Sequence, residues 1–467
     1  MSNTSDRYSI GIDIGTSSIC GILYDRIENR HLTISKANDA NLKTSRAWEK
    51  IQDPRRILEI AFSILSDFLR ENTNISAIGI TGQMHGILYY DAQGQAVSPL
   101  YTWQDARGNL IWREDQTYSE FLTKESGSFI PSGYGLTTHF FNLKNGLVPK
   151  DAVGFCTIAD YVVMKLTGQT KAITDRSNAA SLGLFDVENG QFGNSIPDLI
   201  GMDPSFLPII SNTGVPAGNL NTDLLKNESE LEIPQEIIPV FPAIGDNQAA
   251  FLGAIKSCEK NGNVLNLAES VQITIGTGSQ MAIWSDHYVS VPDLETRPCP
   301  RGGYLLVGAA LSGGSSFALL KNFFEKAIAL FDPDSDRKEI DFYKIMIDQD
   351  WNCRSRNPIQ AETFFCGTRK DPRKRGAIKN IALDNFLPED LIFAFLQGMI
   401  DELYGFYQKV PKELRKGRRQ IACSGNTLRK NELLRSILEK TFGLPLRLSD
   451  CEEEAAFGAA DIDTINR

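Results

Sequence analysis

The chain has 467 residues, 42% of them hydrophobic and 23% charged, with a formal net charge of −10. This composition is ordinary for a soluble globular protein, and the length predicts two domains of about 200 residues each. The acidic balance argues against a nucleic-acid partner and against broad binding to anionic membranes. No apolar run approaches the roughly 18 residues of a membrane span, and the polar N-terminus does not resemble a signal peptide.

The eight cysteines are scattered without a Cys-x-x-Cys pair, and the four histidines do not cluster. Thiols placed singly are typical of reduced cysteines and form neither a disulfide framework nor a zinc site. Together with the polar N-terminus, this pattern indicates a cytoplasmic protein.

Residues 8–24 consist of two short apolar runs that flank a Gly-Thr-Ser-Ser turn. Such a turn can direct several backbone N–H groups and hydroxyls at one point, as in a nest for phosphate oxygens. Asp13, at the end of the first run, could hold Mg²⁺ directly or through water. Small hydroxyl residues also form ordinary hairpin turns, and this stretch alone does not separate the two interpretations.

Residues 53–70 predict a helix, because Asp53 is a good N-cap, Pro54 suits the first turn and an apolar stripe follows. Residues 75–80 predict a strand, which begins an α/β layer. The strand runs into residues 82–86, where two glycines bracket polar residues. That arrangement suits a loop that faces a small polar ligand.

Three side chains near residue 105 allow two interpretations. Trp103 offers a flat apolar wall for the C–H face of a sugar, while Asp105 and Arg107 offer partners for hydroxyl or phosphate groups. An internal Asp–Arg pair beside a core Trp explains the same spacing equally well. His85, as a lone histidine, is more often a structural hydrogen-bonding residue than a catalyst.

The middle of the chain predicts helices over 138–145 and 160–166 with a strand over 155–158 between them. Residues 173–186, polar and then small, suit another loop on the ligand side. Residues 187–235 are richer in Pro, Gly, Asn and Asp and indicate irregular excursions.

Asp246 lies just past the midpoint, where an apolar segment meets a Gly-Asp turn and then a helix of small residues. A carboxylate at the end of a strand suits a general base that faces a cleft. Asp is also a common helix N-cap, and on this stretch alone the cap is the favoured interpretation.

The second half repeats the signature of the first half. Strands over 263–268 and 271–275 lead into Gly-Thr-Gly-Ser at 276–279. Two such turns, one in each half, are typical of duplicated domains that hold a polyphosphate between them. Residues 309–317, with a helix after them, offer helix N-terminal amides to an anion.

Two further segments close the chain. At 420–431 a strand, a glycine turn and a helix follow one another, and the glycine lets a flat ring approach the backbone. The last helix begins within 452–460, where small residues suit tight packing.

In this order the motifs resemble those of the FGGY family of carbohydrate kinases, over residues 8 to about 461. The matching motifs lie at 11–18, 82–86, 103–107, 245–248, 276–279 and 424–426. The resemblance implies an α/β fold of two actin-like (ribonuclease H-like) ATPase domains with a catalytic cleft between them. We expect an N-terminal domain over 1–245 and a C-terminal domain over 246–467. The Ser-Gly pair at 424–425 departs from the two or three glycines of many members.

The resemblance also implies an ATP- and Mg²⁺-dependent kinase of a small sugar, as a monomer or homodimer. Asp246 would then take the proton of the attacking hydroxyl, and Asp13 and Asp246 would hold Mg²⁺. The sugar would contact Gln83, Met84, His85, Trp103, Asp246 and Asn247. The nucleotide would contact Gly15, Thr16, Ser17, Ser18, Gly276, Thr277, Gly313, Gly425, Asn426 and Arg429. This assignment outweighs the cap interpretation of Asp246.

Within the family, residues 157–163, 175–181, 265–272 and 424–431 resemble the members that phosphorylate sedoheptulose. We therefore expect sedoheptulose as the acceptor, with the 7-phosphate as product, and D-xylulose as the second choice. A non-catalytic sugar or nucleotide sensor on the same fold is the rival from another class. The presence of both aspartates argues against that rival. An actin-like filament or chaperone ATPase would not need a Trp against a sugar.

Overall fold

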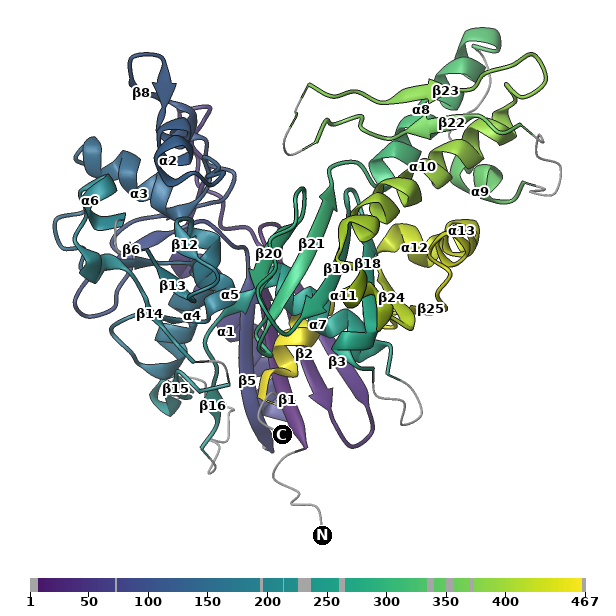
Figure 1. The fold of residues 1–467 in the computed structure, drawn as a ribbon. Helices are drawn as coiled ribbons and strands as arrows, with labels where there is room; N and C mark the ends of the chain where they lie inside the picture. Colours follow the sequence, from purple (N-terminus) through teal and green to yellow (C-terminus); the bar gives the residue numbers. More distant parts are fainter. Residues whose placement is uncertain are drawn as a thin grey trace. The chain divides into compact units, whose positions relative to one another are not determined.

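The computed structural model describes residues 7–71, 74–193, 196–212, 214–225, 237–259, 265–333, 340–349, 357–368, 371 and 373–463. The chain forms two compact units (Figure 1). Unit 1 comprises Met1–Gly253, Arg297–Gly303 and Glu453–Arg467, and unit 2 comprises Ala254–Thr296 and Tyr304–Glu452. Unit 1 therefore includes two segments from the later part of the chain. The single domain boundary expected between residues 245 and 246 does not describe this division.

The main sheet of unit 1 is organised around β1. Its strands are β1 (Tyr8–Ile14), β2 (Ser18–Asp25), β3 (Arg30–Ala37), β5 (Ile75–Gly82), β15 (Gly218–Asn219), β16 (Pro239–Val240) and β17 (Ile244–Gly245). Their order is β15-β16-β5-β1-β2-β3, and β17 also pairs with β5. The strand β1 is antiparallel to β2 and parallel to β5, which confirms the hairpin expected over residues 8–24.

The register of this sheet brings three chain segments to one edge. Asp13 lies beside Thr81 in the β1–β5 pair, and Gly245 lies beside Gly82 in the β5–β17 pair. Because these strands are parallel, the turn after β1, the loop after β5 and Asp246 after β17 all leave the sheet at the same edge. Ligands of open α/β sheets bind at such carboxyl ends.

Helices cover the sheet of unit 1. The longer ones are α1 (Pro54–Glu71), α2 (Tyr118–Ser126), α3 (Gly135–Lys144), α4 (Ile158–Thr167), α7 (Asp246–Ser257), which begins in this unit, and α14 (Glu454–Ala460). The apolar stripe of α1 is buried against the sheet, as its sequence predicted. The Asp53 carboxylate accepts a hydrogen bond from the Arg55 backbone N–H at 2.9 Å, which confirms the predicted start of the helix.

The helix α14 lies directly on the backbones of β1 and β5. A Cβ added at Gly11 would overlap the carbonyl oxygen of Ala456, and one at Gly79 would overlap that of Ala459. A Cβ at Gly458 would likewise overlap the Ala249 carbonyl oxygen in α7. The small residues near the end of the chain therefore pack tightly, as expected, and fix the helix that carries Asp246 against the strand that carries Asp13.

Smaller elements complete unit 1. They are β4 (Ile51–Gln52) paired with β7 (Leu100–Tyr101), β6 (Leu88–Tyr90) with β10 (Gly154–Cys156), β8 (Ile111–Arg113) with β9 (Gln116–Thr117), β11 (Ile173–Thr174) with β14 (Ile209–Ile210), β12 (Phe185–Asp186) with β13 (Gln191–Phe192), and the short helices α5 (Arg176–Ala179) and α6 (Ile196–Ile200). A second, aromatic-rich core, distinct from the core of the main sheet, contains buried residues of α2, α3, β6, β7 and β10.

The sheet of unit 2 has the same pairing pattern as that of unit 1. Its strands are β18 (Ser270–Ile275), β19 (Ser279–Ser285), β20 (Glu295–Pro298), β21 (Tyr304–Ala310), β24 (Gln420–Ser424) and β25 (Leu446–Leu448). The central strand β18 is antiparallel to β19 and parallel to β24, as β1 is to β2 and β5 (Figure 1). This match supports the duplication inferred from the two Gly-Thr-x-Ser turns.

The remaining elements of unit 2 are α8 (Gly314–Phe331), α9 (Phe342–Ile347), α10 (Pro388–Lys409), α11 (Lys412–Lys416), α12 (Asn426–Lys430), α13 (Glu432–Phe442), β22 (Gln360–Glu362) and β23 (Ala377–Lys379). The strand expected over 263–268 is wrong. Residues 263 and 264 lie outside the described residues, and Leu267–Glu269 forms a 3₁₀ turn capped by Asn266. The Asn266 side chain accepts from the Ala268 N–H at 2.9 Å, a local bond that competes with strand pairing.

In the described part of the chain, no helix combines the length and the apolar character needed to cross a membrane. The seven described cysteines are free thiols, and Cys353 lies outside the described residues.

Candidate active site

Three carboxylates from distant parts of the sequence, those of Asp13, Asp246 and Glu453, interact electrostatically in unit 1. Burial, together with the neighbouring charges of Asp246 and Glu453, raises the pKa of Asp13 to about 7. Burial also raises the pKa of Asp246 to about 6, and hydrogen bonds from Asn247 and the charge of Arg297 oppose that shift. A desolvated group of like charges is typical of a functional site, and it favours a cation.

The donor chemistry at Asp13 fits Mg²⁺, which binds hard oxygen ligands. Across the residues that the structure describes, no three or more His, Cys, Asp or Glu side chains form a complete metal site. Magnesium usually takes one or two carboxylates and completes its shell with phosphate oxygens and water. Asp13 is therefore the residue that would hold the ion, with Asp246 and Glu453 contributing negative charge.

Asp246 is the first residue of α7. Its carboxylate accepts hydrogen bonds from the Asn247 side chain at 2.8 Å and from the Asn247 backbone N–H. An N-cap would accept from the second or third N–H of the helix instead. The hydrogen bonds that the Asp246 carboxylate makes to described residues are therefore not those of an N-cap alone.

The loop after β5 lies beside Asn247. The Asn247 Nδ2 is 3.8 Å from the Met84 sulfur, and a Cβ at Gly245 would lie 2.7 Å from the Met84 methyl carbon. Met84 therefore lies against the turn that carries Asp246. Gln83, in contrast, is 5% exposed and donates to the Gln52 side chain at 2.9 Å, so it supports the site from behind.

His85 has a positive φ of 75°, which is unusual for a residue with a side chain. Its ring stacks on Tyr134 with 4.3 Å between the centroids and an angle of 8°. Its Nδ1 lies 2.7 Å from the Ser181 carbonyl oxygen, so Nδ1 carries the proton and donates it. The ring thus forms a flat wall with Tyr134, and the Nδ1 bond fits the structural role favoured from sequence.

The segment around Ser177 and Ser181 holds two site loops in place. The Gly245 N–H donates to the Ser177 hydroxyl at 3.1 Å, and the His85 N–H donates to the Ser181 hydroxyl at 3.1 Å. The polar loop expected on the ligand side therefore positions the residues before Asp246 and around His85.

Trp103 connects the expected sugar wall with the expected phosphate turn. Its side chain is 46% exposed, and its Nε1 donates to the Thr16 hydroxyl at 3.0 Å. A Cβ at Gly133 would overlap the Trp103 carbonyl oxygen, so the backbone of Trp103 packs closely on Gly133, the residue before Tyr134. An exposed indole held in this way can contact the apolar face of a sugar.

The turn after β1 is held through its carbonyl groups. Asn38 donates to the Gly15 carbonyl oxygen at 2.8 Å, and Gln52 donates to that of Thr16 at 3.0 Å. The Ser17 carbonyl oxygen accepts from the Asn38 N–H at 2.9 Å. The turn is therefore fixed on its carbonyl side, which suits a preformed nest of N–H and hydroxyl groups.

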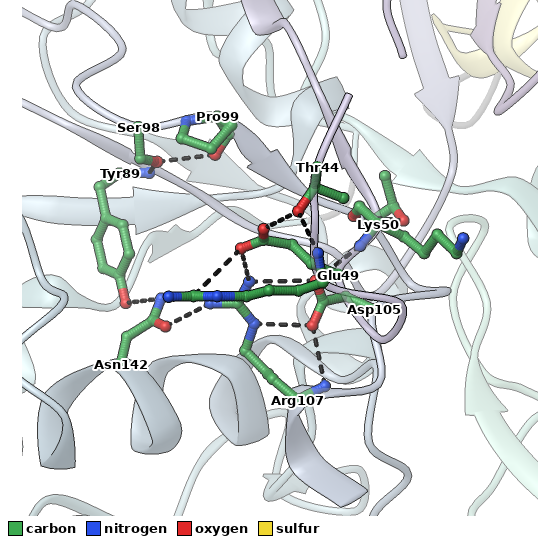
Figure 2. A network of polar contacts seen from close by, with 11 residues as sticks. Thr44, Glu49, Lys50, Tyr89, Ser98, Pro99, Asp105, Arg107 and Asn142 are labelled. Atoms are coloured by element: carbon green, nitrogen blue, oxygen red, sulfur yellow. Dashed lines mark hydrogen bonds and ion pairs between the residues drawn. The ribbon is translucent and has the colours of Figure 1, made fainter. Parts of the chain in front are cut away.

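Asp105 and Arg107 form an internal pair, so the structure resolves the alternative that the sequence left open (Figure 2). Arg107 is 1% exposed, and its Nε lies 2.7 Å from Asp105 Oδ1. Its Nη1 donates to the Asn142 side chain at 2.5 Å, and its guanidinium lies 4.1 Å from the Tyr101 ring centroid. The pair stabilises the region behind Trp103 and does not face a ligand.

In unit 2, the expected nucleotide residues meet around the turn after β18. The Gly313 N–H donates to the Thr277 carbonyl oxygen at 2.9 Å, and the Gly314 N–H donates to that of Gly276 at 2.8 Å. A Cβ at Gly313 would overlap the backbone of Gly278. The N-terminus of the 18-residue helix α8 therefore lies directly on this turn, where its amides favour an anion.

The turn after β24 joins the same cluster. Gly425 has a φ of 95°, and a Cβ there would lie 2.5 Å from the Ile275 carbonyl oxygen. Asn426 begins α12 directly after it. This single glycine thus gives a close approach of the two backbones at the turn. Arg429 donates to the Cys451 carbonyl oxygen, which ties α12 to the segment before α14.

The comparison with known families decides the identity of the chain. Residues 8–253 match the N-terminal domain of the FGGY family of carbohydrate kinases. The chain belongs to this FGGY family. It is therefore an ATP-dependent phosphotransferase that acts on a carbohydrate.

Individual relatives of this FGGY kinase agree with that assignment. Sedoheptulokinase of Mus musculus is 28% identical over 489 residues, which cover 97% of this chain and 96% of the mouse protein. A glycerol kinase of Alteromonas mediterranea is 25% identical and covers 97% of this chain and 89% of its own length. The structure of xylulose kinase from Rhodospirillum rubrum superposes with a TM-score of 0.78 at 19% identity, over 98% of this chain and 90% of the other. The expected two-domain actin-like α/β fold is confirmed.

Three residues that interact with the candidate site could not be found from sequence motifs. Tyr134 stacks on His85, and Arg297 interacts electrostatically with both Tyr134 and Asp246. Glu453 adds its charge to the surroundings of Asp13, although it is 440 positions away in the numbering. These residues are identified by their interactions in the fold, which the spacing of motifs in a single sequence does not reveal.

Proposed function

We propose that this enzyme transfers the γ-phosphate of ATP to a hydroxyl of a ketose, with sedoheptulose as the preferred acceptor and sedoheptulose 7-phosphate as product. The observation that carries the proposal is Asp246, placed at the ligand edge of the sheet beside Met84 and Asn247. The choice of sugar is supported by the similarity to mouse sedoheptulokinase, which extends over nearly all of both chains.

Asp246 acts as the general base in this proposal. A pKa of about 6 keeps the carboxylate ionised at neutral pH and still basic enough to accept a proton from the attacking hydroxyl. The hydrogen bonds from Asn247 hold it in one orientation. Phosphoryl transfer depends mainly on positioning and charge neutralisation, so one directed carboxylate is sufficient on the acceptor side.

The acceptor sugar lies against the wall formed by Trp103, His85 and Tyr134. The exposed indole contacts its apolar face, and the stacked pair of His85 and Tyr134 offers a second flat surface. Met84 extends this surface next to Asn247. The buried Gln83 positions the loop by holding Gln52, which in turn holds the Thr16 carbonyl oxygen.

The nucleotide is bound through two turns. In unit 1, the N–H and hydroxyl groups of residues 15–18 hold phosphate oxygens, and Asp13 holds Mg²⁺. Bound Mg²⁺ neutralises charge on the phosphate oxygens. In unit 2, the turn at Gly276 and the N-terminus of α8 bind phosphate, and Gly425 with Asn426 borders the adenine. The seven described cysteines are free thiols, which favours a cytoplasmic enzyme, and a monomer or homodimer remains the expectation.

The test is ADP release with Mg-ATP across sedoheptulose, D-xylulose, D-ribulose, gluconate and glycerol. We expect the highest kcat/KM with sedoheptulose. A preference for D-xylulose would keep the mechanism and replace the acceptor. ATP binding without turnover of any sugar would indicate the sensor, and ATP hydrolysis that needs no sugar would indicate an actin-like or chaperone ATPase.

A further inference from the structure

Two loops of the proposed active site are joined by one buried glutamine. Gln52 ends β4, and its side chain is 0% exposed. Its Nε2 donates to the Thr16 carbonyl oxygen at 3.0 Å, and its Oε1 accepts from the Gln83 Nε2 at 2.9 Å. We call residues 15–18 the phosphate turn and residues 82–86 the acceptor loop. The Gln52 side chain therefore links the phosphate turn to the acceptor loop within unit 1.

The link requires a primary amide. A backbone carbonyl oxygen only accepts hydrogen bonds, so Nε2 of Gln52 must face Thr16, and this leaves Oε1 to accept from Gln83. Nε2 also donates to the Asn41 side-chain oxygen at 3.1 Å, so both of its protons are used. A carboxylate has no donor and an apolar chain has neither group. Gln52 is thus fixed in one orientation that makes both bonds of the link.

The phosphate turn is held from the acceptor side at a second atom of Thr16. The Trp103 Nε1 donates to the Thr16 hydroxyl at 3.0 Å. An indole N–H only donates, so the hydroxyl accepts from it and keeps its own proton for another acceptor. A phosphate oxygen is such an acceptor. Both the carbonyl group and the hydroxyl group of Thr16 are therefore positioned by residues that come from the side of the sugar.

On the other side of the link, Gln83 lies within the acceptor loop. Its N–H donates to the Ile14 carbonyl oxygen at 2.8 Å, next to the end of the pairing between β1 and β5. Met84 and His85, the expected sugar contacts, follow it directly in the chain. A sugar that orders the acceptor loop therefore also restricts the Gln83 amide and, through Gln52, the Thr16 carbonyl group.

A shared element of this kind couples two binding sites. When the first ligand orders the element, the second ligand binds without that entropic cost, and its affinity rises. The coupling is reciprocal, so the nucleotide strengthens the binding of the sugar by the same factor.

We propose that Gln52 is a positioning residue that couples acceptor binding to nucleotide binding. A ketose on the acceptor loop raises the affinity of the phosphate turn for Mg-ATP, and Mg-ATP raises the affinity for the ketose. This inference rests on the proposed sugar-kinase function and adds cooperative binding to it. Asn41 provides a matched control, because it is exposed and accepts from the same amide without being part of the link.

The experiment measures the Kd of Mg-AMP-PNP, a non-hydrolysable ATP analogue, by calorimetry without and with a saturating amount of the panel sugar that has the highest kcat/KM. In the wild type, the sugar should tighten binding by about fivefold or more. In Gln52→Met and in Gln83→Met, this factor should fall to about twofold or less, because each variant breaks the link at one end. Asn41→Ala should keep the wild-type factor.

Hydrogen exchange separates a positioning role from a structural role. In the wild type, the sugar alone should slow exchange of the backbone amides of the phosphate turn, and in Gln52→Met it should not. The double variant Gln52→Met/Gln83→Met should have the same coupling factor as either single variant, because all three lack the same link. A glutamine that only stabilises β4 would lower the Tm of Gln52→Met and leave the coupling factor and the exchange response unchanged.

A folded Gln52→Met enzyme that keeps the wild-type coupling factor would overturn the inference. If Gln52→Met fails to fold, Gln83→Met decides by the same criterion. A wild-type enzyme that binds the sugar and Mg-AMP-PNP independently also overturns the inference and leaves the proposed function standing. A wild-type enzyme that binds none of the panel sugars refutes the proposed function itself, so the two failures are distinguishable.

Discussion

At the scale of single residues, the surroundings of Asp13 disfavour the ionised form of its side chain. Burial and the carboxylates of Asp246 and Glu453 raise its pKa to about 7, far above that of an exposed aspartate. Such a site is destabilising without a cation and becomes favourable when the cation binds. Stability and function therefore make opposite demands on this residue.

We expect Asp13→Asn to abolish most activity and to stabilise the ligand-free enzyme. Loss of the ion-holding carboxylate should reduce kcat with Mg-ATP by about a hundredfold or more, while removal of a like charge should raise the Tm by a few degrees. Steady-state kinetics and thermal unfolding without Mg²⁺ measure the two effects. A lower Tm in the variant would show that Asp13 is a structural residue.

The buried pair of Asp105 and Arg107 gives a second prediction at this scale. Arg107→Met leaves the Asp105 carboxylate buried without its guanidinium, which should reduce the free energy of unfolding by about 3–5 kcal/mol. Arg46 serves as the control, because its side chain is 55% exposed and 4.0 Å from Glu49. Arg46→Met should change stability by less than about 0.5 kcal/mol. If Arg107→Met and Arg46→Met lowered the free energy of unfolding in urea equally, the internal pair of Asp105 and Arg107 would be contradicted.

At the scale of elements, the contact of α14 with β1 and β5 depends on glycine. Gly79→Ala places a methyl group against the Ala459 carbonyl oxygen, and neither backbone can move freely. We expect a loss of at least about 2 kcal/mol in the free energy of unfolding, measured in urea. Gly405, in the interior of α10, has open space around its Cβ position. Gly405→Ala should therefore gain about 0.5–1 kcal/mol through helix propensity, and a loss at both positions would contradict the packing argument.

The contact between α10 and β22 predicts a pH effect. Burial raises the pKa of Glu402 from 4.5 to about 7, and the Thr363 hydroxyl donates to it at 3.2 Å. Between pH 4.5 and about pH 7 the Glu402 carboxyl group is protonated mainly in the folded state. The free energy of unfolding therefore falls as the pH rises through this range. Above pH 7 the cost is fully present.

We expect Glu402→Gln to remove that cost. Its free energy of unfolding, relative to wild type, should increase by about 1–2 kcal/mol between pH 4 and pH 8, after allowance for partial solvent screening. Urea unfolding of both proteins across this range provides the comparison. Parallel pH profiles of the two proteins would show that Glu402 is not desolvated.

Elements with strong local signals were predictable from sequence, and those that depend on distant partners were not. The helix that begins after Asp53 has a cap, a proline and an apolar stripe, and the structure confirms it. The expected strand at 263–268 failed because Asn266 caps a 3₁₀ turn. Nothing in the sequence indicated that Arg297–Gly303 groups with unit 1, because this grouping arises only in the folded chain.

At the scale of the whole molecule, the duplicated pattern could be inferred from two short turns. Each Gly-Thr-x-Ser turn follows a central strand that has one antiparallel and one parallel neighbour. The family resemblance assigned Asp13 and Asp246 to one site. In the structure, β1, which carries Asp13, and β17, which precedes Asp246, both run parallel to β5 and end at the same edge of the sheet. The sequence could not place Tyr134, Arg297 or Glu453 there, since folding alone brings these positions together.

We propose that this sugar kinase uses Asp246 as its general base. The most direct test is the kcat of wild type and Asp246→Asn with Mg-ATP and the preferred ketose, with ATP affinity and Tm measured on both proteins. We expect kcat to fall by about 10²- to 10⁴-fold while ATP affinity and folding are retained, because an amide keeps the shape and cannot accept the proton. A variant that retains kcat within tenfold of wild type would contradict the role of Asp246 as the base.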